Sequence, residues 1–171
     1  MNAIEVFREA LVWTHELLEM VTADVTSEQL QSIPPGVANP LGAIYAHAII
    51  AEDGVVNALL RGATPLFAGE WAGRTGLSDP QWSLEFERAR NLKMDLPAFR
   101  PYAQAVHASA IEYVASLSEE GLDRPIDLTA QGLGRRTIGW ALSALVVSHL
   151  NNMIGEISCL KGIQGVRGYP F

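Results

Sequence analysis

One segment, residues 41–61, constrains the fold of this chain more than any other. It reads LGAIYAHAIIAEDGVVNALLR, and its apolar residues occur nearly all round a helix rather than along one stripe. A helix with this pattern is buried on most of its sides, so other elements must surround it. Pro40 lies just before the segment and Gly62 just after it, at positions typical of a helix start and a C-terminal cap.

Three further segments show helical spacing. Residues 3–23, 98–118 and 138–161 repeat apolar side chains at intervals of three and four, and Thr137 is a good N-cap for the last of them. No run shows the sustained alternation of a strand. We therefore predict an all-α fold without a sheet, a four-helix bundle in a single domain that spans residues 1–171.

The connections between these helices differ in length. Thr26–Gln29 resembles a capping box and predicts a short helical turn. Residues 63–97 form a long crossover from the second helix to the third, with a short helix predicted around 83–91. Such a crossover allows an up-up-down-down arrangement. Connections longer than about 12–15 residues are often functional, and Trp71 and Trp82 indicate that this one folds over the protein.

Charge and cysteine content restrict the partners and the compartment. The net charge is -7 with scattered basic residues, which argues against a nucleic-acid partner. The single cysteine, Cys159, excludes an intrachain disulfide, and its apolar neighbours predict a buried thiol. We find no leader segment and no apolar run of the roughly 18 residues that a membrane span needs. We therefore expect a cytoplasmic protein without a membrane partner.

Two histidines lie in helices that the apolar pattern buries. His47 has small neighbours, Ala51 and Gly54, which leave room beside an imidazole. His149 lies four residues before Met153, so these two side chains share one helix face. Imidazoles from facing helices can meet in a bundle core and hold a metal ion. The same residues could equally be core histidines that hydrogen-bond to a partner.

A metal site built on these histidines lacks a ligand, since a catalytic zinc site has three protein ligands. A methionine thioether suits Cu(I) rather than zinc or nickel. Glu52 points about 140° away from His47 around the helix, so Glu52 and Asp53 are expected to orient the histidine or to form a salt bridge between helices. His15 and His107 are expected in packing or surface roles. The candidates for the missing ligand are Met153, Asn152, Glu156 and Glu52.

Three stretches together carry a family resemblance: NPLGAIYAHAIIAEDGVVNALLRG (39–62), LDRPIDLT (122–129) and HLNNMIGEISCLKGIQGVRGYPF (149–171). The chain resembles the DinB-like superfamily and, within it, thiol-dependent S-transferases of the YfiT type. The resemblance implies a four-helix bundle, often a homodimer, with a divalent metal held by three histidines. Matched by position, those ligands fall on His47, His149 and Met153, where a thioether stands in place of the third imidazole.

Two functions stay open. The first is a degenerate member of the family that binds a small molecule, or acts through its partner, without a metal ion. The second is an enzyme, an S-transferase or hydrolase, in which a divalent ion such as zinc or nickel lowers the pKa of a thiol or water. Either would act in one pocket, for which the expected lining residues are His47, His149, Met153, Glu52, Asn152, Glu156 and Trp71. A small-molecule ligand and a second copy of the chain are the expected partners.

Overall fold

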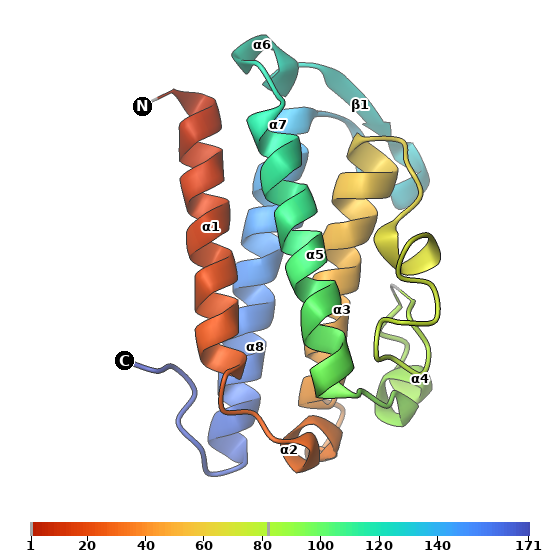
Figure 1. The fold of residues 1–171 in the computed structure, drawn as a ribbon, viewed down its shortest axis with the longest axis vertical. Helices are drawn as coiled ribbons and strands as arrows, with labels where there is room; N and C mark the ends of the chain where they lie inside the picture. The colour runs from red at the N-terminus through yellow and green to blue at the C-terminus, as the bar shows by residue number, and fades with distance from the viewer. Residues whose placement is uncertain (1, 82) are drawn as a thin grey trace.

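The helices expected from the sequence account for most of the structure. The computed structural model describes residues 2–81 and 83–171, more than half of which are helical. Four long helical segments lie side by side (Figure 1). They are α1 (Ala3–Thr22); α3 (Leu41–Asp53) continued by the π-helical η1 (Gly54–Leu60); α5 (Leu96–Ala115); and α7 (Ile138–Ala141), the π-helical η4 (Leu142–Ser148) and α8 (His149–Ile163).

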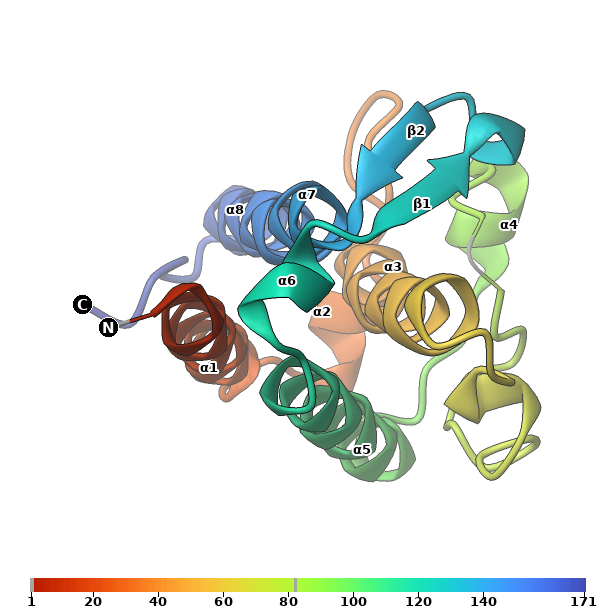
Figure 2. The ribbon, with the colours of Figure 1, turned by 90° about the horizontal axis from the view of Figure 1, so that it is seen from above.

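The chain directions follow from the long crossover. In Figure 1, α1 and α8 run downwards, whereas α3 and α5 both run upwards. The crossover therefore returns the chain to the lower end, and the order is down-up-up-down rather than the arrangement that we expected. Viewed from above, α1 and α3 lie diagonally opposite, and each contacts both α5 and α8 (Figure 2). Short helices occupy the connections: α2 (Ser27–Gln31), η2 (Leu66–Ala68), α4 (Phe86–Asn91) and α6 (Glu119–Leu122).

The expectation of a chain without a sheet was wrong. Strands β1 (Pro125–Leu128) and β2 (Gly134–Thr137) pair antiparallel, with Ile126 opposite Arg136. A short 3₁₀ turn, η3 (Thr129–Gln131), joins them, and Gly132 continues the turn with a left-handed φ of 74°. Each strand has only four residues, which is too few for alternation to stand out in a sequence. The predicted N-cap at Thr137 is present where β2 ends and α7 begins.

The apolar character of the second helix is explained by its surroundings. Contrary to our expectation that no apolar run is long enough for a membrane span, Leu41–Leu60 is long and apolar enough by length and composition. Yet 83% of the tested window is buried inside the protein. Tyr45 on this helix and Phe99 and Tyr102 on α5 are among the largest side chains that are completely buried. The helix that most constrained the fold is thus the one that the other helices cover.

A buried carboxylate fixes the start of the crossover. Asp53 is 0% exposed and accepts four hydrogen bonds of 2.8–2.9 Å. The donors are the backbone N–H groups of Leu66 and Phe67, the amide of Asn57 and the hydroxyl of Tyr102. Burial, and then the charge of Asp53, raise the pKa of the Tyr102 phenol, which stays protonated and donates. One side chain therefore joins α3, α5 and the crossover.

A second set of contacts closes the later part of the crossover into a loop. The N–H of Ser78 donates to the carbonyl of Lys93 at 3.0 Å, and the N–H of Lys93 donates to Ser78 Oγ at 3.0 Å. The N–H of Asp95 donates to the carbonyl of Gly76 at 2.7 Å. Gly76 has a φ of +74°, and a Cβ there would lie 2.6 Å from the carbonyl oxygen of Asp95. We call residues 79–81 and 83–92, which project from this neck, the crossover loop.

Replacing the Asp53 carboxylate should destabilise the fold. Asp53→Asn removes the charge and turns one acceptor into a donor among buried donors. We expect a loss of about 3 kcal/mol in the free energy of unfolding, measured by urea denaturation. Tyr102→Phe, which removes one of the four donors, should cost about 1 kcal/mol. Equal stability of wild type and Asp53→Asn would contradict the role given to this carboxylate.

Candidate functional site

The structure brings together the two histidines singled out in the sequence. His47 lies midway along α3, and His149 is the first residue of α8. Their Nε2 atoms are 3.1 Å apart, with the rings steeply inclined at 72°. At this distance one imidazole donates its N–H to the lone pair of the other. The two residues are 102 positions apart in sequence, so the packing of α3 against α8 creates the pair.

Backbone geometry next to this pair is unusual. The π-helical η4 ends at Ser148, immediately before His149, and η1 begins at Gly54, seven residues after His47. In η1, the N–H of Arg61 donates to the carbonyl of Val56, five residues earlier, at 3.0 Å. Such turns widen a helix and occur frequently at functional sites. Here the two π-helical segments, η1 and η4, directly follow α3 and directly precede α8, respectively.

Burial is the main influence on the charge of His149. The pKa of His149 is lowered to about 4, chiefly by burial and then by the neighbouring His47, whereas Glu52 acts in the opposite direction. The His149 imidazole is therefore neutral near pH 7. A neutral imidazole has one ring nitrogen with a lone pair, which can accept a hydrogen bond or bind an ion.

A small cavity lies beside His47. Its volume is about 10 Å³, which is enough for a single water molecule. Asp79 and Arg88 of the crossover loop, joined by a 2.7 Å ion pair, form part of its wall. The remaining lining residues are Ala43, Ala46, Ile50, Gln81, Ser83, Leu84, Ala89 and Leu92. The crossover therefore covers His47, as we expected of this connection.

Trp71, which we expected in this pocket, does not line the cavity. Trp71 is half-buried elsewhere, with its ring 5.9 Å from Tyr102 and the Arg74 guanidinium over its face. Trp82 lies outside the described residues.

The other expected pocket residues on α8 are dispersed. Met153 is buried in the core, whereas Asn152 and Glu156 are exposed. Glu156 lines a separate surface groove together with Cys159. That cysteine is exposed, contrary to the buried thiol that we expected, because sequence neighbours of a helical residue occupy other faces. None of the α8 side chains after Met153 is among the residues that line the cavity beside His47.

The donor set around the histidine pair fits a catalytic divalent ion poorly. Two nitrogens converge, and Met153 stands where the family resemblance implies a third imidazole. Zinc in catalytic sites takes three protein ligands of nitrogen or oxygen type in most cases, and methionine suits softer ions. The nearest buried carboxylate on α3, Glu52, is turned towards other residues. The two rings are joined by a hydrogen bond between their Nε2 atoms.

A second polar cluster, which our reading of the sequence missed, lies in the core. His15 of α1, Glu52 of α3 and His107 of α5 are all buried, and one ligand atom from each lies within 4.8 Å of the others. His15 Nε2 is 2.7 Å from Glu52 Oε1, and His107 Nε2 is 3.7 Å from Glu52 Oε2. The two imidazoles stack at 3.8 Å. This cluster could hold a metal ion.

The signal for this cluster was present in the helical periodicity. His15 lies four residues after Leu11 and three before Leu18, both of which are buried. His107 has the same relation to Ala103 and Ala110. Burial lowers the pKa of His107 to about 4, while the charge of Glu52 opposes this and His15 adds to it. Instead of packing or surface roles, these histidines flank a buried carboxylate.

Comparisons with known proteins agree with the helical architecture. A family model described as the DinB superfamily matches residues 10–157. Among solved structures, the crystal structure of the conserved protein of locus from Enterococcus faecalis is similar, with a TM-score of 0.77 and 20% sequence identity. The alignment covers 95% of this chain and 99% of that chain. At this identity the likeness concerns the fold. No protein with a curated description matches the chain.

Proposed function

Since this chain belongs to the DinB superfamily, we propose that its functional centre is the His47–His149 pair and that it binds a small molecule without a catalytic metal ion. The single observation that carries the proposal is the 3.1 Å contact between the two Nε2 atoms, combined with a methionine at the third ligand position. The proposal includes the fold: the four helical segments and their crossover form the family's four-helix bundle, in a cytoplasmic protein.

The ligand class follows from the cavity beside His47. Its walls are mostly apolar, and the charges of Arg88 and Asp79 cancel each other at 2.7 Å. Such a site favours a neutral molecule with one polar end that hydrogen-bonds to the His47 imidazole. The cavity has room for only one water molecule, so a larger ligand enters when the crossover loop moves away from α3.

A second candidate function is a divalent-metal-dependent S-transferase or hydrolase. The observation that favours it is the convergence of two imidazole nitrogens, which is the arrangement of ligands around one ion. Bound zinc or nickel would lower the pKa of a thiol or water at the site. If this candidate is right, the metal content of the protein depends on His149. Under the proposed function it does not.

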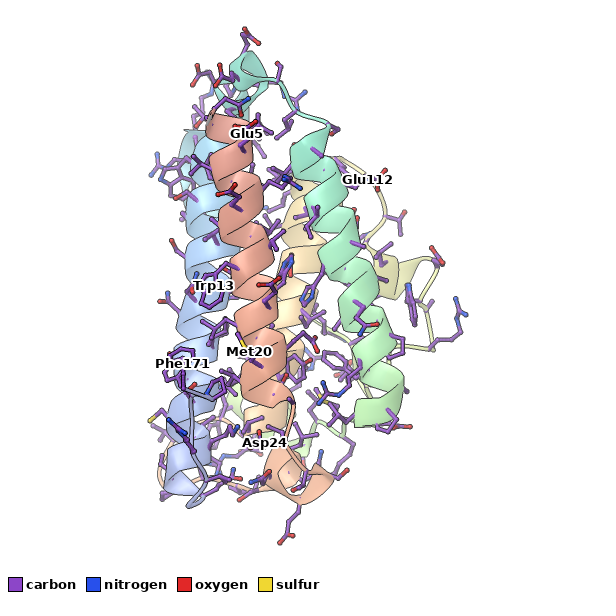
Figure 3. The ribbon with its side chains drawn as sticks, turned by 60° about the vertical axis from the view of Figure 1, so that its left-hand side comes forward. Glu5, Trp13, Met20, Asp24, Glu112 and Phe171 are labelled. Atoms are coloured by element: carbon purple, nitrogen blue, oxygen red, sulfur yellow. The ribbon has the colours of Figure 1, made fainter. Side chains whose placement is uncertain are left out.

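We also propose a homodimer, although for a different reason than the sequence offered. The apolar second helix is already buried within one chain. Instead, Val6, Trp13 and Met20 are exposed at seven-residue intervals along α1 and form one stripe. Figure 3 shows Trp13 and Met20 on the same side of the molecule as Phe171, which is 70% exposed. A second copy of the chain would cover these side chains.

Metal analysis of Met153→His tests whether the metal site implied by the family resemblance lacks its third ligand in this chain. The substitution restores a third imidazole on the face of His149, so untagged protein loaded with zinc should hold about one equivalent more than wild type. Met153→Leu, which keeps the apolar volume, should hold the same amount as wild type. An unchanged zinc content in Met153→His would mean that position 153 does not face the histidine pair.

Ligand-observed NMR with benzyl alcohol and benzoate as probes tests the proposed ligand class. We expect benzyl alcohol to bind and benzoate to bind more weakly, because the cavity has no unpaired cation among the residues described. His47→Phe keeps a ring but removes the polar group and should abolish the benzyl alcohol signal. Glu156→Gln, on an exposed part of α8, is the matched control. Equal signals in wild type and His47→Phe would refute the proposal.

The molar mass in solution tests the dimer. Light scattering after size exclusion should give twice the chain mass for wild type and a monomer for Trp13→Glu, because a charge at the centre of the stripe opposes association. Val37→Glu places the same charge at a position that is 85% exposed and off the stripe, and it should remain a dimer. A monomeric wild type would rule out the assembly.

A further inference from the structure

The buried cluster of His15, Glu52 and His107 has a charge that needs a partner. The three residues are 5%, 0% and 7% exposed, and each comes from a different helix. Within residues 2–81 and 83–171, the ion-pair contacts of Glu52 are with these two histidines, and no lysine or arginine reaches it. A buried carboxylate is stable only when hydrogen-bond donors, a cation or a metal ion satisfy its oxygens, as four donors do for Asp53.

A proton on His15 would satisfy only part of this cluster. An N–H···O hydrogen bond explains the 2.7 Å distance from His15 Nε2 to Glu52 Oε1. It leaves Glu52 Oε2 and His107 Nε2 without a hydrogen-bond partner in the described part of the chain. These two atoms face each other at 3.7 Å, which is too far for a hydrogen bond. Two unsatisfied ligand atoms in a dry core indicate a missing occupant.

The spacing of those atoms suits a metal ion. Zinc binds imidazole nitrogen and carboxylate oxygen at about 2.0–2.2 Å, and two such bonds opened to about 125° hold their outer atoms roughly 3.7 Å apart. Two imidazoles and one carboxylate are a common ligand set for zinc and related ions. Glu52 can supply both oxygens and so complete a four-coordinate, closed site of the kind that structural zinc occupies.

We propose that His15, Glu52 and His107 bind a divalent first-row transition ion, with zinc the best fit, in a structural site that joins α1, α3 and α5. This site is separate from the His47–His149 pair and does not rest on the function proposed for that pair. It places a metal centre on the opposite side of α3, about 140° around the helix from His47.

Binding would change the two histidine rings in a defined way. They are stacked with 3.8 Å between centroids and planes 8° apart, so an ion midway between them lies out of both ring planes. Metal–imidazole bonds lie close to the ring plane, and therefore at least one ring must tilt out of the stack when the ion binds. His15 Nδ1, which has no hydrogen-bond partner among the described residues, can carry the hydrogen that leaves Nε2.

Zinc content and thermal stability of matched variants test the site. Untagged protein loaded with zinc and dialysed should hold about one equivalent, and zinc should raise its melting temperature. His107→Phe, which keeps an aromatic ring in the core, and Glu52→Gln should hold almost none and show no rise. His149→Phe should retain as much zinc as wild type and show the same rise in melting temperature when zinc is added. No retained zinc in wild type would overturn the proposal.

Which variants lose zinc distinguishes this proposal from the function proposed above. Zinc lost in His149→Phe but kept in His107→Phe would overturn the present site and support the metal-dependent enzyme. X-ray absorption at the zinc edge of the wild-type protein covers the case in which core variants do not fold. Nitrogen and oxygen ligands without sulfur are expected, whereas a sulfur ligand would place the ion away from this cluster, for example at Met153 or Cys159, and overturn the proposal.

Discussion

The burial of two adjacent carboxylates on one apolar helix is the constraint on which the rest of this structure depends. Glu52 and Asp53 are both 0% exposed, in a segment whose other residues are nearly all apolar. A carboxylate in such surroundings requires donors or cations around it. Neighbouring residues of a helix point about 100° apart, so the two side chains contact different partners. Asp53 gathers backbone and side-chain donors, whereas Glu52 gathers two imidazoles.

Each of these two sets of partners includes one residue of α5. Tyr102 donates to Asp53, and His107, five residues later, faces Glu52. The parallel course of α3 and α5 is thereby held at two points in the core. The same acidic pair also links the fold to its candidate sites, because Asp53 holds the start of the crossover that covers His47 and the Glu52 charge acts on His149. Scaffold and site therefore share residues.

Most of the helical fold was predictable, since helical periodicity and caps such as Thr137 depend on local sequence. The hairpin was not, because two four-residue strands carry too little pattern. The apolar surroundings of His47 and His149 predicted that both were buried, whereas both are half-buried. Their 3.1 Å contact depends on how α3 and α8 are rotated, which the sequence does not show. His15 was judged by its neighbours in sequence rather than by its helix face, and for that reason its pairing with Glu52 was missed.

The crossover loop leaves the helices at the neck formed by Ser78 and Lys93. The helices are held by their own packing and by Asp53, whereas the loop contacts the rest of the protein at the neck, at the wall beside His47 and through Arg90, which donates to the carbonyls of Gly36 and Ala38. The length and composition of this loop can therefore change during evolution while the helices stay the same. Related proteins that bind different ligands are expected to differ in this loop before they differ in the helices.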